Sequence, residues 1–222
     1  MKRIILGVLI ATVGIELSSC GNWNKTEKGT AIGATAGAVL GGVIGNKAGN
    51  TAAGAILGAV VGGAAGAYIG NQMDKQANEM RKDLEGARIE RIGEGIKITF
   101  ESGILFDVNA AVVRPVAQQN LIKLAGILNK YPETDILVEG HTDTTGTEEY
   151  NLELSKRRAE AVGNFLTGKG VSAKRFQLLG YGESQPADSA NTVSALQTNR
   201  RVEIAVFAND KLKAVAMAKT KD

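Results

Sequence analysis

The apolar residues in the second half of the chain change their spacing several times, and each change predicts a new element. Between Ile92 and Phe100 they occupy every second position, which predicts a half-buried strand. After Pro115 the spacing lengthens to three and four, which predicts a helix that ends at Tyr131 and Pro132. The same criteria predict a strand at Asp135–Glu139, a helix at Glu148–Thr167 closed by Gly168, and strands at Phe176–Leu179 and Arg200–Phe207. The order βαβαββ predicts an α+β fold in which helices cover one face of a mixed sheet.

Before this region, glycine recurs at every fourth position in two registers. The first register is Gly29, Gly33, Gly37, Gly41, Gly45 and Gly49, and the second is Gly54, Gly58, Gly62, Gly66 and Gly70. On a helix this spacing aligns the glycines in one stripe, where the missing side chains let a second backbone approach. We therefore predict a helical hairpin over residues 29–70, with its turn between Asn46 and Thr51. The pattern resembles the glycine-zipper segment of many bacterial envelope lipoproteins.

Several questions about this hairpin stay open at the level of sequence. Helices of about 16 to 18 residues span about 24–27 Å, slightly less than a hydrocarbon core of ~30 Å, so membrane insertion is neither required nor excluded. A flexible Gly/Ala-rich linker is the alternative, although a linker does not need Val, Ile and Leu at so many positions. Glycine stripes also pair between chains, which would give a homo-oligomer.

Charged residues return after Gly70, while the apolar residues keep a helical spacing. Their seam consists of Met73, Ala77, Met80, Leu84 and Ala87. Steps of four and three are typical of a short coiled coil, although two heptads do not establish an oligomer. We interpret residues 71–91 as a helical spacer that holds the next domain, residues 92–207, away from a membrane. Residues 208–222 follow as a charged tail.

The first 19 residues have the features of a secretory signal peptide. Lys2 and Arg3 precede an apolar run of 12 residues from Ile4 to Ile15. A transmembrane anchor is the alternative, but it needs about 20 apolar residues. The following residues 17–20 (LSSC) resemble the bacterial lipobox, whose cysteine is acylated and becomes the mature N-terminus. The resemblance implies a signal peptide over residues 1–19, a lipid on Cys20 and a short lipidated tether over residues 20–28.

The cysteine content and the net charge of the chain limit its possible modifications and partners. Cys20 is the only cysteine among 222 residues, so no intramolecular disulfide can form, and lipid attachment is favoured over a buried free thiol. Removing residues 1–19 takes two of 26 basic and one of 23 acidic side chains, which leaves a net charge of +2. This small charge does not indicate a nucleic-acid partner. Gly21 and Asn22 resemble the residues that sort proteobacterial lipoproteins to the outer membrane, which implies a periplasmic C-terminal domain.

The most informative motifs lie between residues 105 and 203. They are Leu105-Phe106-Asp107, residues 139–143 (EGHTD), Gly146, Asn151, Leu154-Ser155, Arg158-Ala159, residues 180–182 (GYG) and residues 199–203 (NRRVE). In order and spacing they are similar to those of the OmpA-like peptidoglycan-binding domain. The resemblance covers residues 92–207, about half the chain. It implies an OmpA-C-like βαβαββ sandwich that binds peptidoglycan non-covalently through the diaminopimelate of the stem peptide.

The physical chemistry of two motif residues suits such a ligand. The free end of diaminopimelate carries an ammonium and a carboxylate on one carbon. Asp143 can accept hydrogen bonds from the ammonium, and Arg158 can hold the carboxylate with paired donors. The resemblance implies that these two are the main ligands, supported by Asn151 and Asp107, with Thr144 and Thr145 lining the pocket. We add Arg201 as a further candidate ligand.

Two alternatives remain at this site. From the two residues alone, Asp143 and Arg158 could instead form an ion pair that pins a helix to the sheet. Arg200 and Arg201 alternate to opposite faces of a strand, and the sequence does not say which of them reaches the ligand.

An enzyme is not indicated. His141 is the only histidine, and strand alternation places it on the same side as Asp143. No third metal ligand or nucleophile stands at a diagnostic spacing. We therefore predict no catalytic residue, no metal ion and no cofactor. The favoured function is a tether between the outer membrane and the wall. An oligomeric glycine-zipper pore is the alternative, and a conductance measurement would distinguish the two.

Overall fold

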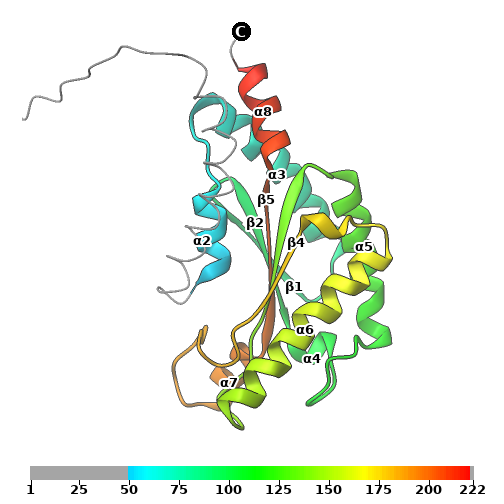
Figure 1. Cartoon of the computed structure of the whole chain (residues 1–222), viewed down its shortest axis with the longest axis vertical. Helices are drawn as coiled ribbons and strands as arrows, with labels where there is room; N and C mark the ends of the chain where they lie inside the picture. Colours follow the sequence, from blue (N-terminus) through cyan, green and yellow to red (C-terminus); the bar gives the residue numbers. More distant parts are fainter. Residues whose placement is uncertain (1–49, 221–222) are drawn as a thin grey trace, which may run out of the picture.

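The computed structural model describes residues 50–220, and a mixed five-stranded sheet lies at its centre (Figure 1). The strands lie in the order β1-β2-β5-β3-β4. All neighbours are antiparallel except β3 and β4, which are parallel. The strands are β1 (Ala87–Ile92), β2 (Gly95–Glu101), β3 (Thr134–Gly140), β4 (Phe176–Gly180) and β5 (Arg201–Ala208).

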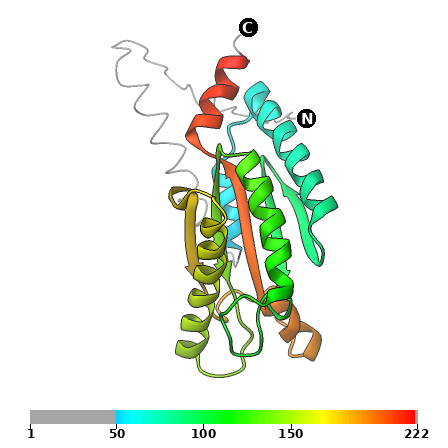
Figure 2. The same ribbon diagram turned by 90° about the vertical axis from the view of Figure 1, so that its right-hand side faces the viewer.

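Two long helices, α5 (Pro115–Lys130) and α6 (Glu148–Gly168), cover one face of the sheet and enclose the main core (Figures 1 and 2). Alternate residues of each strand point into this core, so Ile98 of β2 and Ile204 of β5 are fully buried. The shorter helices are α4 (Ser102–Leu105), the 3-10 helix η1 (Ala173–Arg175), α7 (Val193–Asn199) and α8 (Asp210–Lys219). The predicted α+β class, with helices on a mixed sheet, is confirmed.

Helix α3 (Gly63–Asp83) is part of the folded domain and not a spacer. Its apolar seam packs into the main core, where Met73 and Met80 are at most 1% exposed. The predicted charged tail is helical from Asp210 to Lys219. This helix, α8, lies against α3 (Figure 2). The spacer predicted for residues 71–91 is therefore wrong, because its helical periodicity serves packing within the chain.

Helix α3 also ends earlier than predicted, and an edge strand follows it. The backbone is extended at Leu84 and turns at Gly86, where φ is +68°. Strand β1 then pairs with β2 through a tight hairpin and places Ile89 opposite Ile98. This pairing satisfies backbone groups along β2 that would otherwise lack partners, which favours a strand over a longer helix. The sheet therefore begins at residue 87, before the predicted domain start at residue 92.

Helix α2 (Thr51–Gly58) packs on the opposite face of the sheet from α5 and α6 (Figure 1). This second apolar cluster consists of Ala52, Ala55, Ile56, Ala59, Leu137, Ala205 and Phe207. Helices α5 and α6 therefore cover one face, as predicted, and α2, which was predicted as part of the glycine hairpin, covers the other. The first glycine register, residues 29–49, lies outside the described residues, as do residues 1–28. Within residues 50–220, no helix is both long enough and apolar enough to cross a membrane.

The second glycine register does not form one continuous helix. It is interrupted between α2 and α3, where φ is +75° at Gly62 and +60° at Gly63. Glu94 of the β1–β2 turn accepts hydrogen bonds from the backbone N–H groups of Val61 (2.9 Å) and Gly62 (2.8 Å). A Cβ on Gly66 would lie 2.1 Å from Oε1 of Glu94. These glycines therefore permit a turn and the close approach of a carboxylate.

The docking of α2 can be tested with two neighbouring residues. Ile56 is fully buried, whereas Leu57 is 57% exposed. We expect Ile56→Ala to lower the free energy of unfolding by about 2–4 kcal/mol, because it leaves a cavity against the sheet. Leu57→Ala should change it by less than about 1 kcal/mol. Urea titration of the full chain, followed by far-UV circular dichroism, measures both values. Equal, small effects would contradict the docking.

Candidate ligand-binding site

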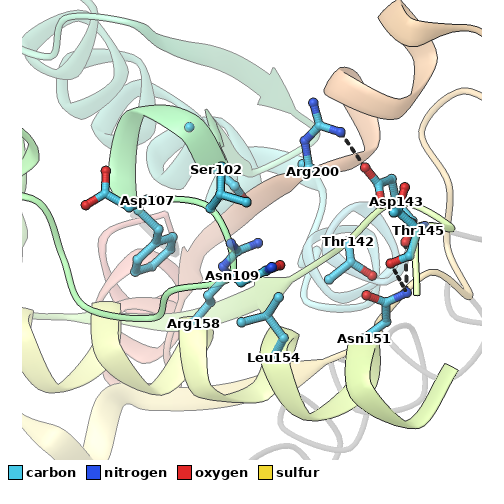
Figure 3. A pocket seen from close by; sticks show the side chains of 13 residues that line it. Ser102, Asp107, Asn109, Thr142, Asp143, Thr145, Asn151, Leu154, Arg158 and Arg200 are labelled. Carbon is cyan, nitrogen blue, oxygen red and sulfur yellow. Dashed lines mark hydrogen bonds and ion pairs between the residues drawn. The ribbon is translucent and has the colours of Figure 1, made fainter. Parts of the chain in front are cut away.

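A cavity of about 370 Å³ opens near the end of β3 (Figure 3). Helix α4 and the loop after it, the connection from β3 to α6, α6 itself and Arg200 just before β5 supply its walls. Charged side chains from distant parts of the sequence meet here. They are Asp107, Asp143, Arg158 and Arg200.

Two glycines on neighbouring strands let α6 approach the sheet closely. Gly140 of β3 is the cross-strand partner of Gly180 of β4, and α6 passes directly over both. A Cβ on Gly140 would lie 2.1 Å from the backbone oxygen of Ser155, and a Cβ on Gly180 would lie 2.4 Å from the backbone nitrogen of Lys156. Oγ of Ser155 also accepts a hydrogen bond from the backbone N–H of Gly182 (2.8 Å). This packing fixes α6 beside the end of β3.

The carboxylate of Asp143 is held in the cavity by two partners (Figure 3). Its Oδ1 accepts a hydrogen bond from the backbone N–H of Thr145 (2.9 Å), and its Oδ2 is paired with Arg200. Burial raises the pKa of Asp143, but the Thr145 N–H and the Arg200 guanidinium outweigh burial and bring the pKa below its ordinary value. Asp143 is therefore ionised at neutral pH and can bind a cation.

Arg158 reaches the same cavity from α6. It is only 4% exposed, its Nε donates a hydrogen bond to the backbone oxygen of Ala110 (2.9 Å), and its guanidinium lies 5.3 Å from the ring centre of Phe106. Burial lowers the pKa of Arg158, but an arginine keeps its charge in a protein. Among residues 50–220, the hydrogen bonds of this guanidinium use Nε alone, which leaves both terminal nitrogens for a ligand.

Asn151 connects the loop after β3 to α6. Its Nδ2 donates hydrogen bonds to the backbone oxygens of Asp143 (3.1 Å) and Thr145 (3.2 Å) and to Oε2 of Glu183 (2.7 Å). Because Asn151 is buried and on the rigid helix, it fixes the position of the Asp143 loop. The structure therefore brings Asp143, Asn151 and Arg158 together, as the sequence predicted.

Two family models match the chain: the OmpA family over residues 105–200 and the YMGG-like Gly-zipper over residues 1–74. Over 120 residues the chain is 39% identical to the peptidoglycan-associated lipoprotein of Mesorhizobium japonicum. The match covers 53% of this chain and 71% of that protein. This chain belongs to the OmpA family.

Another relative and a solved structure extend the comparison. The chain is 34% identical over 134 residues to the probable lipoprotein YiaD of Escherichia coli, which is 60% of this chain but only 61% of YiaD. The structure of the cell wall anchor of the T6SS from Pseudomonas aeruginosa is 29% identical and has a TM-score of 0.54. The match covers 62% of this chain and 97% of the chain in that structure.

One prediction of an OmpA-family site residue is wrong, because Arg200 and not Arg201 lines the cavity. Arg201 is 4% exposed on the opposite face of the sheet, where its Nε bonds to Oε1 of Glu203 (2.7 Å). Arg200 lies just before β5 and lines the cavity, whereas Arg201 begins the strand on the face that also carries Ala205 and Phe207. The ion pair considered between Asp143 and Arg158 is also not formed, since Asp143 pairs with Arg200.

The remaining predicted residues differ in whether they line the cavity and in how far they lie from Asp143. Thr145 lines the cavity, but Thr144 is exposed and does not. Asp107 lies at the far end of the cavity from Asp143, with a side chain 78% exposed and 3.3 Å from Nε of Arg114 (Figure 3). Thr142, which was noted only as part of the motif at residues 139–143 and not as a ligand, also lines the cavity.

His141 and Asp143 do not share a site. His141 is fully buried, stacks on Tyr181 and lies 3.7 Å from a carboxylate oxygen of Glu139. Asp143, two residues later, enters the cavity instead. The chain leaves the regular strand after Gly140, so strand alternation no longer applies to these two residues.

Proposed function

We propose that this chain is an outer-membrane lipoprotein that binds peptidoglycan non-covalently through the diaminopimelate of the stem peptide. The observation that carries the proposal is one ionised carboxylate, Asp143, lying in the same cavity as the guanidinium groups of Arg158 and Arg200. A zwitterionic ligand needs both charges within a few ångströms. A cavity of about 370 Å³ has room for such an amino-acid end group.

The binding step follows from the partners of each group. The ligand's ammonium takes the place of Arg200 at Oδ2 of Asp143, while Thr145 continues to hold Oδ1. The released Arg200, whose side chain is 43% exposed, turns toward the ligand carboxylate. Arg158 offers its terminal nitrogens to the same carboxylate with paired, charge-assisted hydrogen bonds. Asn151 keeps the Asp143 loop in place throughout.

The comparisons support this assignment without extending it to the whole chain. One relative is named a peptidoglycan-associated lipoprotein, and one solved neighbour is described as a cell wall anchor. In our proposal the signal peptide (residues 1–19) is removed, Cys20 carries the lipid, and the wall-binding domain lies in the periplasm. The chain then tethers the outer membrane to the wall and acts as a binding protein, without catalysis.

The alternative, an oligomeric glycine-zipper pore, receives less support from residues 50–220. A pore of this kind requires the second glycine register to lie in the membrane or against other chains. In the folded domain α2 instead packs on the sheet, and α3 packs into the main core. We therefore favour the tether.

Co-sedimentation with insoluble peptidoglycan tests the proposal. The purified full chain should sediment with the wall, and Asp143→Ala or Arg158→Ala should weaken binding by about 2–5 kcal/mol, because each leaves a buried charge unpaired. Arg157→Ala is the matched control, since Arg157 is exposed on the same helix and should bind as the native chain does. Circular dichroism checks the folding of each variant. Folded Asp143 and Arg158 variants that bind normally would overturn the proposal.

A further inference from the structure

A second polar cluster lies on the opposite face of the sheet, outside the ligand-binding cavity. Glu139 of β3 and Glu203 of β5 are direct cross-strand partners, and both are at least 96% buried, with 1% and 4% exposure. Like charges directly opposite each other in a sheet repel, and burial strengthens the repulsion. A positive group between them would remove this conflict.

The two nearby cations, Arg201 and Lys97, both lie close to Glu203 and not to Glu139. Oε1 of Glu203 lies 2.7 Å from Nε of Arg201, and its Oε2 lies 3.8 Å from Nζ of Lys97. Among residues 50–220, Glu139 has no lysine or arginine within ion-pair distance, and its one ion-pair contact is His141 Nε2 at 3.7 Å. Glu139 is therefore the buried carboxylate that most needs a further positive charge.

His141 gives an independent indication of a missing partner. It is fully buried, yet neither ring nitrogen has a hydrogen-bond partner among residues 50–220. Its ring orientation is fixed by stacking on Tyr181, with centroids 5.7 Å apart. Buried polar groups are almost always satisfied, so an imidazole with two unused nitrogens points to a bound ion or water.

We propose that Glu139, His141 and Glu203 bind a divalent transition-metal ion, with zinc as the best match. One ligand atom from each of the three residues lies within 4.8 Å of the others. One imidazole nitrogen and two carboxylate oxygens are a ligand set that zinc accepts, with a water molecule completing the tetrahedron. The ion would lie between the two facing carboxylates and would satisfy His141 at the same time.

The neighbouring cations fit around such an ion. Arg201 can keep Oε1 of Glu203, which orients that carboxylate while Oε2 binds the metal, as partners of metal ligands often do. Lys97 lies 3.5 Å from Oε2 of Glu90 and can remain paired there. Helix α2 covers this face of the sheet, so the ion would be enclosed in the domain rather than exposed at its surface.

The sole histidine makes the test specific. The full chain would carry Cys20→Ser, which removes the only thiol, and would have no histidine tag. The chain is produced with ¹⁵N-labelled histidine, treated with a chelator that is then removed, and titrated with Zn²⁺. The proposal predicts that one equivalent of Zn²⁺ shifts the ring nitrogen signals of His141. Because this measurement uses the native cluster, it does not depend on the folding of a variant.

Cobalt provides the second measurement and the controls. One Co²⁺ per chain should give the visible absorption of a four-coordinate site, and Zn²⁺ should displace it. Glu139→Gln should weaken Co²⁺ binding at least tenfold, while Glu153→Gln, which changes an exposed carboxylate on α6 outside the cluster, should leave it unchanged. Unshifted His141 signals at a tenfold excess of Zn²⁺ would overturn the proposal and leave ordered water as the partner of His141. Equal Co²⁺ affinity in the native and folded Glu139→Gln chains would also overturn it.

Discussion

Replacing Gly140 with alanine is expected to lower the free energy of unfolding by about 3 kcal/mol or more, at the upper end of overpacking effects. The added Cβ would lie 2.1 Å from the backbone oxygen of Ser155, and backbone atoms cannot move aside as the end of a flexible side chain can. Helix α6 would have to move away from the sheet. Because α6 carries Asn151 and Arg158, wall binding should weaken as well. Urea unfolding and co-sedimentation of the same variant measure the two effects.

Gly126 provides the matched control for this substitution. It lies inside α5, and a Cβ at this position would meet no atom within 4 Å. Alanine should therefore stabilise the helix by roughly 0.5–1 kcal/mol, because glycine has more backbone freedom to lose on folding. If Gly140→Ala and Gly126→Ala changed stability alike, the close approach of α6 to the sheet would not be essential.

The second large effect is a loss of stability of the metal-free chain as pH rises. Burial and the neighbouring Glu203 raise the pKa of Glu139 from 4.5 to about 8. Between these pH values the folded chain holds a proton on Glu139 that the unfolded chain releases. The contribution of Glu139 to the free energy of unfolding is therefore greatest below pH 4.5 and decreases as the pH rises toward 8. The full difference is about 5 kcal/mol at most.

Glu139→Gln isolates this contribution, because glutamine stays neutral at every pH. The free energies of unfolding of the native and variant chains would be compared at about pH 5, 6.5 and 8 with a chelator present, so that no metal ion competes with the proton. The native chain should lose stability relative to Glu139→Gln as pH rises. Parallel curves for the two chains would contradict a protonated, buried Glu139.

The main elements could be predicted because their periodicity is unambiguous, and the missed elements show where periodicity is insufficient. Strand β2 alternates clearly at Ile96, Ile98 and Phe100, whereas the helical seam of α3 continues through Leu84 and Ala87 into β1. The end of the helix at Asp83 depends on pairing with β2, which is a tertiary effect. Local sequence therefore could not separate β1 from the helix before it.

The docking of α2 was missed for a different reason. Glycine at every fourth position indicates close backbone approach, but it does not identify what approaches. The partner is the second face of the sheet, where Leu137, Ala205 and Phe207 form an apolar patch. In β5 the residues on both faces are apolar over much of the strand, so the sequence does not reveal which face is covered by which helix.

The same ambiguity in β5 explains the misassigned arginine. Alternation predicted that Arg200 and Arg201 point to opposite faces, and this is confirmed. Since both strand faces are buried, the apolar residues that follow do not mark one face as the ligand side. The sequence could have identified Arg200 as the arginine of the cavity only if it had revealed which face of β5 packs on the main core.

Competition for the wall-bound full chain shows whether the cavity recognises both the ammonium and the carboxylate at the free end of diaminopimelate. Two soluble stem peptides would be compared, one containing diaminopimelate and one containing lysine, which keeps the ammonium but lacks the second carboxylate. We expect the diaminopimelate peptide to release the chain from peptidoglycan and the lysine peptide to do so at least tenfold less well. Equal release by both peptides would contradict a role for Arg158 and Arg200 in binding that carboxylate.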